Sequence, residues 1–143
     1  MRVPEEMSPG SKAHHTAKWA RTMTKWLVTY TRRKGARWNL VDFGGMTKSE
    51  SRGIVDLIAI RKDHRQDRPG LKRGDLFEIV VIQTKGGAAP RSTADDITRL
   101  KKVARHHKAR AIILAEWQRG ERLELFQLKG SRWYSVSPDE IFG

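Results

Sequence analysis

Apolar residues in the first part of the chain recur at helical spacing. Between residues 11 and 35 they return every three or four positions, which predicts an amphipathic helix. The members of this stripe are Ala13, Ala17, Ala20, Met23, Leu27 and Tyr30, and Trp19 and Trp26 widen it. Residues 1–10 contain two prolines and one glycine, and this composition predicts a flexible N-terminal arm.

Further along, apolar residues gather in short runs rich in β-branched side chains, and such runs predict strands. The runs cover residues 37–45, 53–61, 76–85, 111–117 and 122–129, with a less regular sixth at 132–136. Between the second and third runs, the basic segment 61–75 contains Pro69, Gly70 and Gly74. These turn residues predict a long hairpin loop.

Two later segments have the features of helices. Residues 92–110 are predicted to form a second helix, capped by Ser92 or Thr93 and with Leu100 facing inward. Near the end of the chain, a serine followed by proline and, three positions on, by glutamate at residues 137–140 predicts a short terminal helix that starts with a capping box.

The predicted order of elements is α-β-β-β-α-β-β, which indicates an α/β fold with a mixed β-sheet flanked by helices. Its first three strands are expected to be antiparallel, and the helix after the third permits a parallel crossover to the fourth. A chain of 143 residues suffices for one compact domain, so we predict that residues 11–143 form a single domain.

The charge of the chain narrows the range of partners. The 29 Lys and Arg residues against 16 Asp and Glu residues give a formal net charge of +13, which favours nucleic acid. We predict no membrane association, because no apolar stretch is long enough to cross a bilayer. The absence of cysteine excludes disulfides, thiolate zinc sites and cysteine nucleophiles, and it is compatible with a cytoplasmic, nucleoid-associated protein.

One acid interrupts the most apolar predicted strand. Asp56 is the only polar residue between positions 54 and 60, and burying such a carboxylate is costly unless it is paired, hydrogen-bonded or bound to a cation. Gln83 and Lys85 end the third predicted strand and share one face, because side chains alternate along a strand. If the two strands pair as a hairpin, Asp56 lies beside Gln83.

These groups can form a metal-assisted hydrolytic site. The carboxylate of Asp56 and the amide oxygen of Gln83 are ligands that suit Mg²⁺, and the backbone carbonyl of Thr84 is a further candidate. Lys85 would orient or help to deprotonate a water molecule, or stabilise charge on a phosphate. The Gly86–Gly87 pair, which follows directly, would let a phosphate backbone approach closely.

The combination of Asp56 with "QTK" at residues 83–85 resembles the signature of the PD-(D/E)XK nuclease superfamily. Within it, "GIVDLIAI" and "DITRLKKVARHHKARAIILAEW" are most similar to archaeal-type Holliday junction resolvases, and the glutamine variant is similar to Mrr-type endonucleases. The resemblance implies a restriction-endonuclease-like fold and a Mg²⁺-dependent endodeoxyribonuclease, with Mn²⁺ able to substitute. It also implies branched DNA such as a Holliday junction as the partner, a role in DNA recombination and repair, and a homodimer.

The chain departs from the family pattern in three places. Val55 stands where a proline commonly precedes the acid, and Gln83 replaces a second acid, which lowers the negative charge of the site. Residues 7–41 contain no acid, although many members of the family carry a glutamate on the first helix. Glu50 is therefore an additional candidate metal ligand, and His15 is a candidate for the helix position.

Plainer roles exist for the same residues, because Asp56 also suits an ion pair with Arg52. The candidate nucleic-acid contacts are Lys72, Arg73, Arg91 and Arg99, together with the two glycines, and a solvated surface suits these cations equally. Two other functions remain open. One is a restriction- or repair-type nuclease that acts on duplex, nicked or flapped DNA, and the other is a non-catalytic nucleic-acid-binding module on the same fold.

Overall fold

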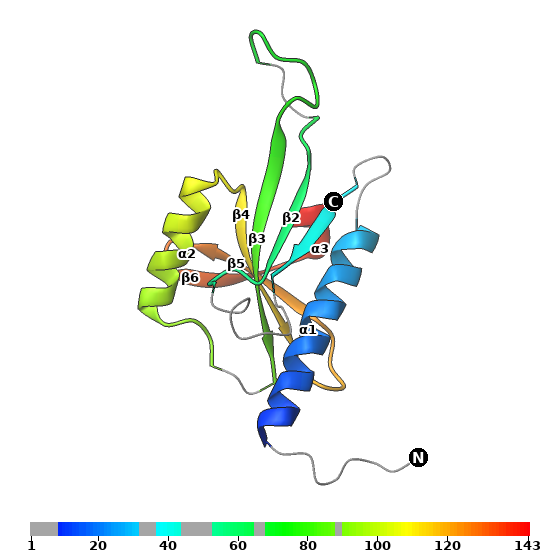
Figure 1. Cartoon of the computed structure of the whole chain (residues 1–143), viewed down its shortest axis with the longest axis vertical. Helices are drawn as coiled ribbons and strands as arrows, with labels where there is room; N and C mark the ends of the chain where they lie inside the picture. The colour runs from blue at the N-terminus through cyan, green and yellow to red at the C-terminus, as the bar shows by residue number, and fades with distance from the viewer. Residues whose placement is uncertain (1–8, 32–36, 44–52, 65–67, 88–89) are drawn as a thin grey trace.

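The computed structural model describes residues 9–31, 37–43, 53–64, 68–87 and 90–143, with side chains of the first helix described at 16 and 18–31. Figure 1 shows a central sheet with helices on both sides. The elements in chain order are α1 (Pro9–Thr31), β1 (Asn39–Asp42), β2 (Leu57–Lys62), β3 (Phe77–Gly86), α2 (Ala94–His106), β4 (Ala111–Trp117), β5 (Glu124–Lys129), β6 (Arg132–Val136) and α3 (Pro138–Phe142). Within the described residues, no helix has the length and apolarity needed to span a bilayer.

The strands lie in the sheet in the order in which they occur in the chain, from β1 to β6. Neighbouring strands are antiparallel at every position except β3 and β4, which run parallel. The parallel pair is joined by α2, because a crossover connection is what a parallel pair requires. The predicted α/β fold with a mixed sheet, and the antiparallel pairing of its first three strands, are therefore confirmed.

One face of the sheet packs against α1 and α3. The core on this side is made of apolar side chains that are fully or almost fully buried, among them Val28, Leu57, Val80, Ile82, Ile113 and Phe142. The predicted inward stripe of α1 is only partly right. Ala20 of the stripe is buried, but so are Thr24 and Val28, which it did not include, whereas Trp26 and Tyr30 are 55% and 84% exposed. Thr24 is tolerated inside because its hydroxyl donates to the carbonyl of Ala20 at 2.7 Å.

The other face of the sheet packs against α2. Leu100 is buried on this helix as predicted, and buried Val81 and Leu114 face it because their neighbours in the strands face α1. Thr93, not Ser92, caps α2, and it forms a capping box with Asp96. The predicted capping box of the terminal helix is also present at the start of α3.

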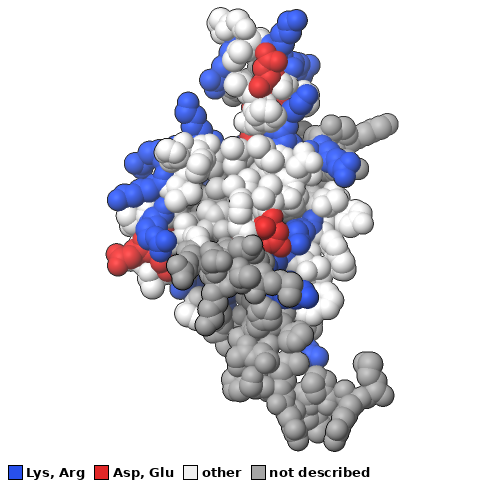
Figure 2. Space-filling model, viewed as in Figure 1, with Lys and Arg blue, Asp and Glu red and all other residues white. Residues whose placement is uncertain are grey.

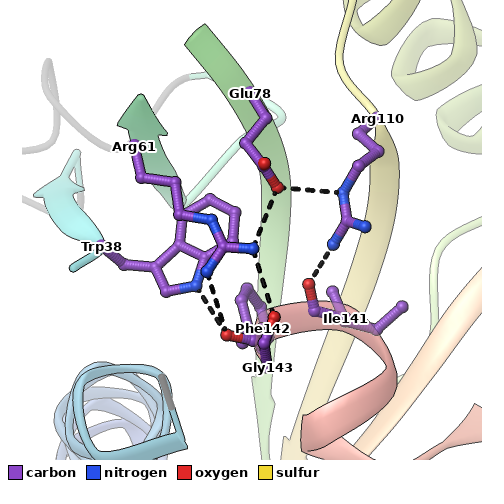
Figure 3. A network of polar contacts seen from close by, with 7 residues as sticks. All are labelled: Trp38, Arg61, Glu78, Arg110, Ile141, Phe142 and Gly143. Carbon is purple, nitrogen blue, oxygen red and sulfur yellow. Dashed lines mark hydrogen bonds and ion pairs between the residues drawn. The ribbon is translucent and has the colours of Figure 1, made fainter. Parts of the chain in front are cut away.

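A buried polar network fastens the last helix to the sheet (Figure 3). Arg61 of β2 and Glu78 of β3 are 8% and 5% exposed and lie 3.3 Å apart, and Arg61 stacks 4.1 Å above the ring of Trp38. Arg61 and the indole N–H of Trp38 both donate to the carbonyl oxygen of Phe142. Arg110 joins the network through Glu78 and through a backbone carbonyl of α3. Every cation in the network therefore has a partner.

Candidate functional site

The predicted motif lies where the two central antiparallel strands end. Leu57 pairs with Ile82, so Asp56, which directly precedes β2, lies next to Gln83 at the level of the backbone. The amide of Asp56 donates to the carbonyl of Ile82 at 3.0 Å, which extends the ladder by one bond. The structure thus brings the start of β2 and the end of β3 together, as the sequence predicts.

The side chain of Asp56 turns toward Thr84. Its Oδ2 accepts a hydrogen bond from the Thr84 amide at 2.8 Å, and the Thr84 hydroxyl lies 3.4 Å away. Among the described residues, none donates a hydrogen bond to Oδ1. The proposed structural partner Arg52 lies outside the described residues.

The surroundings of Asp56 favour its neutral form. Burial raises the pKa of this carboxyl above its ordinary value, and it outweighs the Thr84 amide and the positive charge of Arg21, which both lower the pKa. The nearby negative charge of Asp42 raises the pKa further. A cation bound here would offset this penalty, because it would compensate the partly buried negative charge.

Gln83 makes two hydrogen bonds, and neither reaches Asp56. Its side-chain N–H donates to the carbonyl of Ile54 at 3.0 Å, and its carbonyl oxygen accepts from the hydroxyl of Ser92. Gln83 therefore links the segment before β2 to the segment before α2. An amide oxygen has two lone pairs, so the bond from Ser92 leaves one for a further ligand.

Lys85 lies at the end of the same face and contacts an acid that the sequence analysis did not identify. Its ammonium donates to the carbonyl of Gly87 at 3.1 Å and lies 4.0 Å from Oε1 of Glu116. Lys85 and Glu116 are register partners on the parallel strands β3 and β4. An acid at the carboxyl end of the strand after the crossover helix is the sequence signal that would have pointed to Glu116.

Arg91, a predicted DNA contact, is engaged with this acid. Its guanidinium binds Glu116 through two nitrogens at 2.6 and 3.1 Å, in bidentate geometry. Its Cζ also lies 4.6 Å from the centre of the Phe126 ring. Arg91, Glu116 and Lys85 therefore form a chain of charges along one side of the site.

A second missed acid lies on the other side. Asp42 ends β1 and pairs with Leu57, and the amide of the next residue, Phe43, donates to the carbonyl of Asp56. The carboxylate of Asp42 lies 2.9 Å from Nζ of Lys25 and 3.7 Å from Nε of Arg21, both on α1. Its sequence signal is its place as the first acid after the stretch 7–41, at the end of a predicted strand.

The candidate residues divide between the two faces of the sheet. Gln83 and Lys85 share the α2 face, while the side chain of Thr84 lies on the α1 face because strand side chains alternate. The structure joins Asp56 to Thr84 and Lys85 to Glu116. In the part of the chain that is described, no hydrogen bond or ion pair joins the side chain of Asp56 to that of Gln83 or Lys85. No group of three or more His, Cys, Asp and Glu residues suits a metal ion there either.

Gly86 has a packing reason to be glycine. A Cβ atom at this position would lie 2.6 Å from the carbonyl oxygen of Thr16 on α1, which is too close for any real contact. Gly87 has a positive φ of 63°, and its amide donates to the carbonyl of Trp117. The contact of this pair with a phosphate stays a prediction.

The other predicted site residues are spread over the molecule. Arg99 lies exposed on α2, 3.6 Å from Asp96 one turn earlier. Lys72 and Arg73 are exposed in the hairpin between β2 and β3. Glu50 and the side chain of His15 lie outside what the structure describes.

No family model matches the sequence, and no curated protein matches it. Among solved structures, the chain is similar to Hjc, a Holliday junction resolvase of the archaeal hyperthermophile Archaeoglobus fulgidus. The match has 12% sequence identity and a TM-score of 0.47, and it covers 86% of this chain and 98% of the Hjc chain.

Proposed function

We propose that the protein is a metal-dependent endonuclease that hydrolyses phosphodiester bonds in DNA. The observation that supports this most directly is the meeting of Asp56 and Thr84 at the ends of β2 and β3, where Lys85 also lies. A partly buried acid beside the "QTK" segment, in a chain with a net charge of +13, suits a site that takes a polyanion and a divalent cation.

The residues present fit one hard cation such as Mg²⁺, with Mn²⁺ as a substitute. Asp56 would hold it through Oδ1, since its other oxygen is bound to the Thr84 amide. The carbonyl of Thr84 is directed to the same side as its amide, because both groups of a strand residue face the same neighbour. Gln83 extends from the α2 face, so its remaining lone pair would serve the same cation only through a water molecule of its shell. Mg²⁺ commonly takes one or two carboxylates and completes its shell with waters and substrate phosphates.

A bound cation would supply Lewis acidity and a more acidic water molecule. The ammonium of Lys85, held by the Gly87 carbonyl and by Glu116, would orient that water or stabilise charge on the phosphate. Arg91 fixes Glu116 and thereby the position of Lys85. In this proposal Asp56 and Lys85 act on the substrate, and Glu116 and Arg91 are positioning residues.

For the substrate, we propose branched DNA such as a four-way junction, cut by a homodimer. The support is the likeness of the Asp56 and "QTK" residues to the resolvase signature. Linear, nicked and flapped duplexes are the competing substrates, because nothing in the hydrolytic chemistry depends on a branch.

A non-catalytic DNA-binding module is the second candidate. Both polar atoms of the Gln83 amide are already used inside the protein, by Ile54 and Ser92. Gln83 therefore has a structural role that would persist without a metal. A site with one carboxylate would bind a cation weakly, and the basic surface would then act alone.

Cleavage of a four-way junction, a flap and a linear duplex of the same sequence separates these functions. Each substrate is incubated with Mg²⁺, Mn²⁺ or EDTA, and binding is measured in EDTA in parallel. We expect metal-dependent cutting, fastest on the junction, that D56N and K85A each lower by about a hundredfold or more while DNA binding is retained. Asp95→Asn, an exposed acid on α2, is the matched control. A wild type that binds DNA but cuts none of the substrates in either metal would establish the binding module instead.

A further inference from the structure

We infer that the connection between β2 and β3, described at residues 63–64 and 68–76, is a DNA-binding arm that contacts duplex phosphates about one helical turn away from the cleavage site. The inference depends on the proposed function only for the position of the cleavage site. Figure 1 shows the described part of this connection projecting beyond the helices and the rest of the sheet. It lies at the end of the β2–β3 ribbon opposite to Asp56 and Lys85.

Hydrogen bonds join the two sides of the arm, so its described part has a defined conformation before DNA binds. The amide of Asp63 donates to the carbonyl of Leu76 at 2.8 Å, and the amide of Gly74 donates to the carbonyl of Asp63 at 3.2 Å. Nε of Arg73 crosses to the carbonyl of His64 at 2.6 Å. A pre-shaped arm loses less conformational entropy on binding than a loose loop does.

The exposed side chains of the described part of the arm include the cations Lys72 and Arg73, and Lys62 is exposed at its base. The carboxylate of Asp75 accepts from the backbone amide of Lys72, so this acid serves the turn. Neither Lys72 nor Arg73 forms an ion pair with a described residue. Figure 2 shows several Lys and Arg side chains around the projecting tip, with acidic atoms between them.

The length of the β2–β3 ribbon matches about one turn of a DNA duplex that lies along it. The strand from Phe77 to Lys85 spans about 26 Å at roughly 3.3 Å per residue, and the arm extends beyond Phe77. One turn of duplex measures about 34 Å. The site and the arm would therefore contact the same side of the duplex, one turn apart. A two-stranded ribbon also has the dimensions of the major groove. Lysine and arginine side chains that contact phosphates bind DNA without sequence specificity.

Binding measurements on duplexes of different length test the arm. Affinity is measured by fluorescence anisotropy in EDTA over a range of salt, with duplexes of about 10 and about 30 base pairs, one and three turns. On the long duplex, we expect K72Q/R73Q to reduce the salt slope by about 1.8, or 0.9 for each lost phosphate contact, and to weaken binding at least tenfold at low salt. On the short duplex, which cannot reach both site and arm, the variant and the wild type are expected to bind alike.

The matched control is K129Q/R132Q, which removes the same two charges from the β5–β6 turn. An equal loss in this control, an unchanged slope in K72Q/R73Q, or an equal loss on both duplexes would overturn the inference. If circular dichroism shows that K72Q/R73Q is unfolded, K72Q alone is used, because the Lys72 side chain makes no hydrogen bond with a described residue, and its expected slope change is about 0.9. No cleavage is involved, so a failure of the nuclease proposal leaves this readout unaffected.

Discussion

The carboxylate of Asp56 accepts a hydrogen bond from the backbone amide of Thr84 at 2.8 Å, where β2 begins and β3 ends. A side chain here takes the place that a strand carbonyl would occupy if the ladder continued. The bond satisfies one carboxylate oxygen but does not offset burial, which keeps the pKa of Asp56 above its ordinary value. Such a carboxylate is costly to the fold and suited to a cation, which is the combination expected of a functional site.

Asp56→Asn tests whether the carboxylate destabilises the fold while it serves cleavage. The amide side chain keeps an oxygen for the Thr84 amide but carries no charge, so we expect cleavage to fall more than about a hundredfold, because a lost metal contact removes several kcal/mol of transition-state stabilisation. We also expect the midpoint of urea unfolding at neutral pH, without divalent cations, to rise above that of the wild type. A lower midpoint would show that ionised Asp56 stabilises the fold and that its burial is fully compensated.

The raised pKa of Asp56 also predicts a pH dependence. Between 3.8, the ordinary value, and the raised value, the folded protein retains a proton that the unfolded chain has released. The contribution of Asp56 to the free energy of unfolding therefore falls as pH rises through this window. We expect the advantage of D56N in urea unfolding to be absent below pH 3.8 and to reach its full size above the raised pKa. If the difference in unfolding free energy between D56N and the wild type does not change with pH, the ionisation of Asp56 is not its cause.

The fold could be predicted from the sequence because its elements have strong local signals. The apolar runs around Ile58 and Val80 predicted two strands, and the acids and hydroxyls before Leu100 predicted a capped helix. The inward face of α1 was harder to predict, because hydrophobicity favoured Tyr30 over Thr24. Thr24 is buried because its hydroxyl finds a partner within the helix, and periodicity alone contains no information on that bond.

The site could be predicted only in part. The alternation rule placed Gln83 and Lys85 on one face, and strand pairing placed Asp56 beside them along the backbone. The rotamer that turns Asp56 toward Thr84 has no signal in the sequence. Glu116 was missed for another reason. Its contact with Lys85 depends on the register of a parallel pair of strands, and thirty residues of chain, 86–115, separate the two side chains.

Lys85 and Glu116 are expected to affect cleavage differently. K85A removes the cation nearest the substrate and should lower kcat by about 100-fold or more, comparable to the loss of one transition-state donor. E116Q leaves Lys85 in place without its fixing carboxylate and should lower kcat about tenfold with little change in KM. Single-turnover kinetics on the preferred substrate measure both. If E116Q lowers KM instead, Glu116 acts on binding, because the glutamine no longer holds Arg91 away from the DNA.

The network of Figure 3 predicts that replacing Glu78 lowers the stability of the fold strongly. Replacing Glu78 with glutamine leaves the buried guanidinium of Arg61 without its counter-charge, and breaking such a buried pair costs about 3–5 kcal/mol. Lys102→Ala, at an exposed position on α2, should change the free energy of unfolding by less than about 0.5 kcal/mol. Urea unfolding measures both variants. A small loss in E78Q would mean that the carbonyls of Phe142 and Gly143 satisfy Arg61 by themselves.

The packing of α1 against the end of β3 gives the last prediction. Gly86→Ala places a methyl group 2.6 Å from the carbonyl oxygen of Thr16, and neither backbone can yield without moving the helix. We expect a loss of about 1–3 kcal/mol in the free energy of unfolding, as for other overpacked positions. Gly53→Ala is the matched control, because its Cβ would meet nothing closer than 4.0 Å. If G86A folds with wild-type stability but loses DNA cleavage, the glycine is required for the approach of a phosphate and not for packing, and the sequence-based role of this position would be the correct one.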